Sequence, residues 1–242
     1  MRYLSFLFVG TFVFIFSCST KKEHTDSTST TDSLAVSGEI SKEDWVMIPG
    51  ERAGLITATC SEKDLVRLLG RENVAERDTI FLAEGDFMLG TILYKNTPNE
   101  VQIIWKDTLA FAIPDWVSVG SWEVGKIEAS KSNWKTIQGV KLGTTLKELE
   151  KINGKPFSFY GFGWDLGGGA SGWNGGKLTG KDGLAYFNVQ LSYDFMDEKT
   201  QAIADNLMGD NEFLSNTTAA QKLNPYVSMM SIRFQDELKP NR

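Results

Sequence analysis

The sequence predicts an α+β protein made of two tandem helix-led modules, each a short helix packed on an antiparallel meander sheet. Three observations lead to this prediction. A capped amphipathic helix occurs twice, and Leu65 of the first aligns with Leu149 of the second at an offset of 84 residues (149 − 65). Short segments rich in β-branched and aromatic residues follow each helix. The segment 185–193 also alternates apolar and polar residues, with the period of two that a half-buried strand requires.

An export signal is predicted over residues 1–17. Arg2 precedes an apolar run over residues 4–16, which is long for a core strand and short for a membrane span. The run closes on Ile-Phe-Ser-Cys at residues 15–18, which resembles the lipobox of bacterial lipoproteins. In that family, signal peptidase II cleaves before the cysteine, whose thiol receives a diacylglycerol and whose new amino group is usually acylated. The resemblance implies that Cys18 is lipidated.

Lipidation would place the protein in the bacterial cell envelope, facing the periplasm or exposed on the surface. The membrane is then a partner through the N-terminal lipid, because two or three acyl chains give stable anchoring whereas one is marginal. The alternative is a secretory signal that is cut elsewhere, with Cys18 incidental.

A flexible tether is predicted over residues 18–39. It consists mostly of Ser, Thr, Asp and Lys and has almost nothing to bury that would offset the entropy of ordering. The only histidine, His24, lies in this segment. The folded part therefore has no histidine to serve as a general base, zinc ligand or triad member.

Cysteine content and charge exclude further classes of protein. Lipidation of Cys18 leaves only Cys60, so no intramolecular disulfide can form. Without a histidine to activate it, Cys60 is expected to be a small, partly buried apolar residue rather than a nucleophile. The chain has 25 Lys and Arg against 31 Asp and Glu, a formal net charge of −6, which argues against a nucleic-acid partner.

The first module is predicted over residues 40–130. Its helix matches the second helix at the offset of 84 through the following pairs: Lys63 with Lys147, Asp64 with Glu148, Leu68 with Ile152, Gly70 with Gly154 and Arg71 with Lys155. Short β segments follow at 79–82, 87–94, 101–105 and 110–113. Turn sequences separate them, so a meander is expected. The alternative to a repeat is that both helices share only the common punctuation of short amphipathic helices.

The second module is predicted over residues 131–242. Thr145 and Glu148 have the spacing of a capping box, and Gly154 with Pro156 ends a helix expected over 145–153. The aromatic residues that follow predict a strand entering a glycine-rich loop. After the alternating strand, a helical insertion is expected over 198–208 and a last strand over 226–234.

The helix-led unit resembles the recurring module of the superfamily that contains β-lactamase inhibitor protein and the small lipoproteins of outer-membrane assembly. In the second copy the likeness lies in Thr145, Glu148, Leu149, Ile152, Gly154 and Pro156. The first copy departs from it with Glu72 at the position of Pro156. The resemblance implies an α+β fold whose sheet face binds other proteins without catalysis. Through the lipobox and the tract ending at Trp164 and Asp165, the mature chain also resembles an uncharacterised family of lipoproteins of the Bacteroidota.

Trp164, Asp165 and Trp173 are the candidate binding residues, in a stretch with eight glycines between Gly161 and Gly176. Two interpretations stay open. Asp165 either belongs to a tight turn between buried aromatic residues or, with the indoles, holds a partner or a sugar. The glycines either permit close backbone contacts or form a mobile loop that orders on a partner.

No catalytic residue, cofactor site or metal site is predicted. Residues 175–182 approach the Walker A spacing, but Asp182 replaces the hydroxyl residue that would bind Mg²⁺. Glycosidase chemistry would need a second carboxylate beside Asp165, and no spacing nominates one. We expect a lipid-anchored, non-catalytic binding or assembly module of the cell envelope with a protein or glycan partner. The alternative is an envelope carbohydrate-active enzyme or glycan binder centred on Trp164 and Asp165.

Overall fold

The computed structural model describes residues 41, 44–121, 125–180 and 186–234. The predicted signal peptide over 1–17, the lipidation site Cys18 and the tether through residue 39 lie outside the described residues. The contacts of the chain place Glu39–Arg242 in one compact unit. The two predicted modules, 40–130 and 131–242, therefore belong to the same unit.

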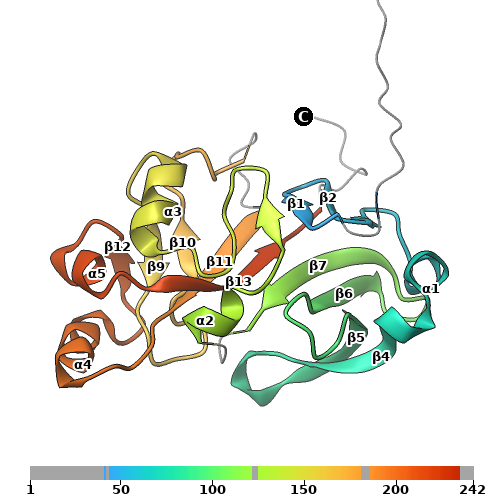
Figure 1. Ribbon diagram of the computed structural model, residues 1–242, viewed down its shortest axis with the longest axis horizontal. Helices are drawn as coiled ribbons and strands as arrows, with labels where there is room; N and C mark the ends of the chain where they lie inside the picture. Colours follow the sequence, from blue (N-terminus) through green and yellow to red (C-terminus); the bar gives the residue numbers. More distant parts are fainter. Residues whose placement is uncertain (1–40, 42–43, 122–124, 181–185, 235–242) are drawn as a thin grey trace, which may run out of the picture. The chain divides into compact units, whose positions relative to one another are not determined.

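The described residues have an α+β fold, as predicted, with five short α-helices and three sheets of mainly antiparallel strands (Figure 1). The strands are β1 (Val46–Ile48), β2 (Arg52–Ala53), β3 (Ile56–Thr57), β4 (Val74–Phe81), β5 (Phe87–Leu93), β6 (Val101–Asp107), β7 (Ala112–Gly120), β8 (Lys135–Thr136), β9 (Ser158–Tyr160), β10 (Ala170–Gly172), β11 (Phe187–Ser192), β12 (Glu212–Leu214) and β13 (Tyr226–Ile232). The helices are α1 (Glu62–Leu69), α2 (Lys126–Ala129), α3 (Leu146–Asn153), α4 (Glu198–Ala204) and α5 (Thr218–Leu223), with 3₁₀ turns η1 (Arg71–Asn73), η2 (Ala83–Gly85) and η3 (Asp205–Leu207).

The largest sheet has six strands in the order β11-β13-β7-β6-β5-β4. Strands β4 to β7 form the antiparallel meander that the turn residues predict. Strand β4 begins at Val74, earlier than the predicted segment 79–82. The sequence pattern does not indicate its first half, because that half is charged. It also carries a register shift between Ala75 and Asp78. Charges and a bulge are usual on an edge strand, where they discourage pairing with other chains.

Strand β7 joins the two halves of the chain. The last strand, β13, pairs antiparallel with β7, with Ser231 opposite Ser118, and β11 pairs with β13. The period of two predicted for β11 is confirmed, since its odd-numbered residues are buried and its even-numbered residues are half-buried. Both halves thus contribute to one sheet.

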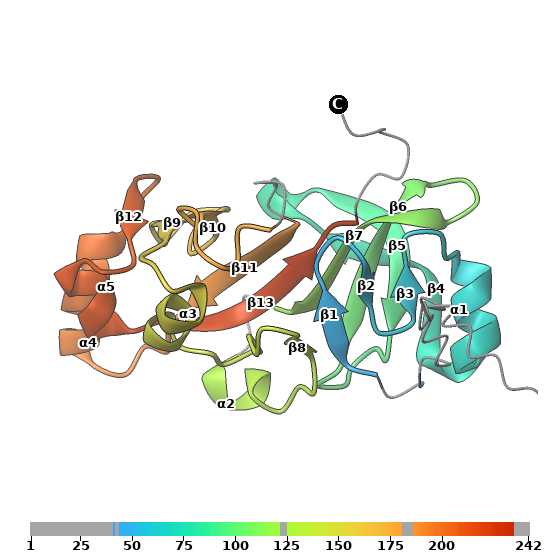
Figure 2. The ribbon, with the colours of Figure 1, turned by 90° about the horizontal axis from the view of Figure 1, so that it is seen from above.

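A hydrophobic cluster runs through both halves of the described chain. The small sheet β3-β2-β1-β8 lies against one face of the six-stranded sheet (Figure 2). Met47 and Ala53 of this small sheet are fully buried, as are Leu65 of α1 and Leu149 of α3. Because a fully buried leucine anchors each helix, packing as well as the end caps stabilises both helices.

Both predicted helices are capped as their sequences indicate. Thr145 and Glu148 form a capping box at α3, and Ser61 and Asp64 form one at α1. Helix α3 ends at Gly154, which adopts φ +77, a left-handed conformation that glycine adopts without strain. The expected helix over 145–153 is therefore confirmed to within one residue.

Equivalent backbone hydrogen bonds join each helix start to the beginning of a sheet strand. At α1, the N–H of Glu62 donates to the carbonyl of Phe111 at 2.8 Å, and the N–H of Ile113 donates to Cys60 at 3.1 Å. At α3, the N–H of Leu146 donates to Pro225 at 2.7 Å, and the N–H of Val227 donates to Thr144 at 2.8 Å. The helix residues in these pairs are again 84 positions apart (146 − 62 and 144 − 60).

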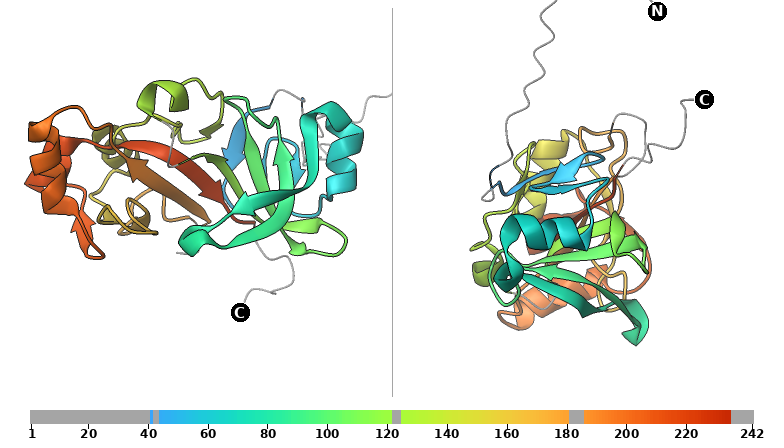
Figure 3. Two further views of the ribbon diagram at one scale, coloured as in Figure 1. Left: turned by 90° about the horizontal axis from the view of Figure 1, so that it is seen from below. Right: turned by 90° about the vertical axis from the view of Figure 1, so that its right-hand side faces the viewer.

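The predicted helical insertion lies between β11 and β13. Helix α4 and turn η3 occupy the expected range 198–208, and β12 and α5 follow them. Helices α4 and α5 pack together at the end of the unit that lies away from α1 (Figures 1 and 3). The chain then returns to the large sheet as β13, which covers most of the predicted strand 226–234.

Candidate binding surfaces

The glycines between residues 161 and 176 permit close backbone contacts. A Cβ atom on Gly161 would lie 2.5 Å from the carbonyl oxygen of Gly209, and one on Gly168 would lie 2.1 Å from that of Leu191. The N–H of Leu191 also donates to the carbonyl of Gly168 at 2.8 Å. These contacts favour the first of the two interpretations of the glycines, in which they allow segments of backbone to approach.

Asp165 lies in a tight turn. The N–H of Gly167 donates to the carbonyl of Trp164 at 2.9 Å, so Asp165 and Leu166 are the two central residues of a four-residue turn. Asp165 is exposed. The turn explains why an aspartate precedes the glycines, and it leaves this residue accessible from solvent.

Trp173, the third candidate, lies in the core and is only 4% exposed. Its ring stacks on that of Phe187 with a centroid distance of 5.7 Å, and it lies 5.4 Å from the ring of Phe157. Its Nε1 donates to the carbonyl of Phe187 at 3.0 Å. Trp173 therefore packs among core aromatic residues, and little of its ring is left for a partner to contact, unlike the expectation from the sequence.

Trp164 is 36% exposed and is held in place from two sides. Its Nε1 donates to the carbonyl of Gly161 at 2.9 Å. Its ring meets that of Tyr160 edge to face, with a centroid distance of 5.5 Å. An aromatic side chain that is already fixed loses little conformational entropy when a partner covers it.

Two further exposed apolar residues lie near Trp164 in the fold, Leu166 in the same turn and Met208 beside Gly163, and we call Trp164, Leu166 and Met208 the Trp164 surface. Leu166 is 51% exposed and Met208 is 38% exposed. The methyl carbon of Met208 would lie 2.6 Å from a Cβ on Gly163, so its side chain covers that glycine. Sequence reasoning missed Met208, because only the fold brings the end of the insertion next to the loop. Leu166 had a local signal, since a large apolar residue stands between Asp165 and three glycines.

Cys60 and Glu62, at the start of α1, are buried titratable groups. Burial raises the pKa of the Cys60 thiol to about 12, so the nucleophilic thiolate is scarce at neutral pH, in line with the predicted inert cysteine. Burial also raises the pKa of Glu62, which accepts a hydrogen bond from the Thr91 hydroxyl at 3.1 Å. Thr91 in turn accepts from Nε1 of Trp105 at 2.8 Å. Within the described ranges, no group of three His, Cys, Asp or Glu residues is placed to hold a metal ion.

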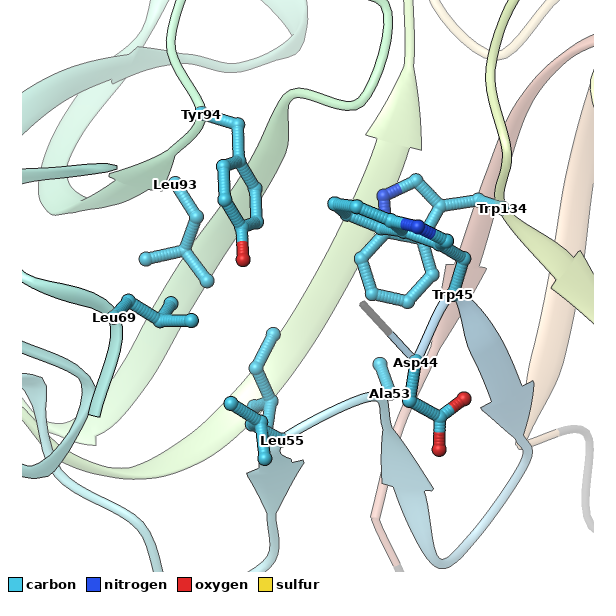
Figure 4. A pocket seen from close by; sticks show the side chains of 9 residues that line it. Asp44, Trp45, Ala53, Leu55, Leu69, Leu93, Tyr94 and Trp134 are labelled. Carbon is cyan, nitrogen blue, oxygen red and sulfur yellow. The ribbon is translucent and has the colours of Figure 1, made fainter. Parts of the chain in front are cut away.

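A small cavity lies between β1–β3 and the large sheet (Figure 4). Trp45 packs edge to face against both Tyr94 and Trp134, with centroid distances of 5.2 Å in each case. Asp44 at the rim pairs with Arg52 at 2.7 Å. The cavity measures about 10 Å³, which is room for about one water molecule. It is too small to hold a substrate.

No protein family, curated protein or solved structure matches this chain in the comparisons. Among the described residues, no helix has both the length and the apolar character needed to cross a membrane.

Proposed function

We propose that this protein is a lipid-anchored, non-catalytic binding or assembly module of the bacterial cell envelope. Cys18 carries the lipid, residues 18–39 are the tether, and the Trp164 surface contacts the partner. The observation that carries the binding role is the exposed indole of Trp164, which Gly161 and Tyr160 fix in place. Exposed apolar side chains occur nearby at Leu166, in the same turn, and at Met208, beside Gly163. Rigid aromatic side chains in an apolar setting are typical anchors of protein interfaces.

A protein partner accounts for this surface better than a glycan does. Leu166 and Met208 add exposed apolar side chains near Trp164, whereas sugar recognition depends on several directed polar contacts beside the ring. Asp165 supplies one exposed carboxylate next to Trp164. It fits the polar edge of a mainly apolar contact.

We also propose that the chain contains two tandem helix-led modules that share the six-stranded sheet. The equivalent hydrogen bonds of α1 and α3 support this, because they occur at the offset that relates the two helix sequences. The capping boxes at Ser61 and Thr145 are also 84 residues apart. In this proposal, α4, β12 and α5 are an insertion in the second module.

The lipid anchor is tested by replacing Cys18 with alanine in the full-length chain. We expect the variant to incorporate no labelled palmitate and to fractionate as a soluble protein or an uncleaved precursor, because the acceptor thiol is gone. Cys60→Ala is the matched control and should keep full labelling, since Cys60 is buried. Palmitate labelling of Cys18→Ala at the level of the unaltered protein would rule out the anchor.

A further inference from the structure

The end of the β4–β5 hairpin leaves the six-stranded sheet as a two-stranded arm. Residues Asp78–Phe81 pair with Phe87–Gly90, whereas β5 pairs with β6 only over Thr91–Leu93. Among the strands that the structure describes, the arm, residues 78–90, accordingly has no partner on the β6 side, and it projects from the fold (Figures 1 and 3). Within the described strands, its ladder pairs are those of the hairpin, while Ile80 on its other face is buried at 3% exposed.

The arm exposes large apolar side chains next to an acidic tip. Phe81 and Phe87 face each other across the hairpin and are 79% and 66% exposed, and Leu89 on the same face is 50% exposed. Over residues 79–94, the charged side chains are Glu84 and Asp86, both at the turn. Side chains of this size are rarely left together in water without a partner.

A second surface of the same chain has the complementary character. It comprises α2 and the hairpin from Lys135 to Lys141, and we call it the basic face. Residues 126–148 hold two glutamates, Glu128 and Glu148, and five lysines, namely Lys126, Lys131, Lys135, Lys141 and Lys147. Lys131 forms an ion pair with Glu128 at 2.6 Å. Ile127 and Ile137 on this face are 79% and 61% exposed. This segment carries a net positive charge, whereas the whole chain has a formal net charge of −6.

Several contacts bring the basic face together. Lys135 and Lys141 are partners in an antiparallel bridge, and the N–H of Thr136 donates to the carbonyl of Val140 at 2.8 Å. Hydrogen bonds from Thr145 lower the pKa of Glu148, and the charges of Lys126 and Lys141 lower it further. Both lysines therefore lie close enough to this carboxylate to affect its charge. Glu148 and the bridge thus relate Lys126, Lys135 and Lys141, and the two exposed isoleucines are close to these lysines in the sequence, Ile127 next to Lys126 and Ile137 two residues after Lys135.

We propose that the arm of one molecule docks on the basic face of a second copy of this chain. Phe81, Phe87 and Leu89 would cover Ile127 and Ile137, while Glu84 and Asp86 meet the lysines. The contact is heterologous, so a pair keeps one free arm, on one molecule, and one free basic face, on the other, and assembly can continue or close into a ring. A membrane surface is a poorer occupant, because anionic headgroups repel an acidic tip. The inference goes beyond the proposed function and does not depend on the lipid or on the Trp164 surface.

Sedimentation of the chain from Ser19 onward, which lacks only the signal and the lipidated cysteine, tests this inference. The unaltered chain should form dimers and larger species as its concentration rises. An arm variant, Phe81→Thr with Phe87→Thr, and a face variant, Ile137→Thr with Lys135→Glu and Lys141→Glu, should each associate at least about tenfold more weakly. Leu214→Ser alters another exposed apolar residue, 46% exposed, and should change nothing. Circular dichroism first establishes that every variant is folded.

Mixing the two variants gives the decisive result. The arm variant keeps an intact basic face and the face variant keeps an intact arm, so an equimolar mixture should form a one-to-one complex that grows no further. A monomeric unaltered chain at its highest soluble concentration would overturn the proposal, and so would a mixture that stays monomeric. Binding of the monomeric chain to phosphatidylcholine vesicles through Phe81 and Phe87 would overturn it in favour of a membrane contact.

Discussion

Replacing Trp173 with alanine should lower the free energy of unfolding by about 3 to 5 kcal/mol, the range for truncating a buried aromatic residue. The indole stacks on Phe187 and contacts Phe157, and the change would leave a cavity at this contact. It would also leave the carbonyl of Phe187 without the donor that Nε1 supplies. An unpaired buried acceptor adds to the cost.

Urea unfolding of the chain from Ser19 onward measures this effect, with Trp164→Ala as the control. Trp164 is partly exposed, so its truncation should cost no more than about 1 kcal/mol, near the scale of surface substitutions. If the two variants lost equal stability, the assignment of Trp173 to the core and Trp164 to the surface would be wrong.

Leu65→Ala and Leu149→Ala should each destabilise the fold by about 2 to 5 kcal/mol, as buried leucine truncations do. Both side chains are fully buried, and both sit at the same position of a capped helix. Because the two helices pack into one cluster, either loss should unfold the whole unit in a single transition.

Thermal melting followed by circular dichroism checks this expectation. Lys63→Ala and Lys147→Ala, at exposed positions of the same two helices, provide matched controls and should shift stability by about 0.5 kcal/mol or less. A loss below about 0.5 kcal/mol for either leucine, the scale of surface changes, would mean that its helix is not packed as described.

The sequence allowed the local elements to be predicted, since their signals lie within a few residues of each other. Thr145 and Glu148 cap their helix through side-chain to backbone bonds three residues apart, and Gly154 ends it. The meander followed from turn residues between alternating segments. Each of these features is decided by neighbours along the chain.

The tertiary arrangement could not be predicted, because it depends on contacts between distant residues. Pairing of β13 with β7 joins residues more than a hundred positions apart, and no local pattern indicates which strand edge is free to receive another. Trp164 and Trp173 both stand among glycines, and only the stacking on Phe187 decides which of them is buried. The β4–β5 arm was likewise missed, since Phe81 and Phe87 have the pattern of core residues in the sequence.

Partner capture from bacterial envelope membranes tests the proposed function most directly, with the tagged full-length chain as bait. Three baits are compared by quantitative mass spectrometry: the unaltered chain, Trp164→Ala with Leu166→Ser, and the control Leu109→Ser, which changes an exposed residue, 90% exposed, in another loop. We expect one envelope protein to be enriched by the unaltered and control baits and to fall at least about tenfold with the Trp164 variant, a loss on the scale of a hot spot. Equal enrichment by all three folded baits would contradict recognition through the Trp164 surface.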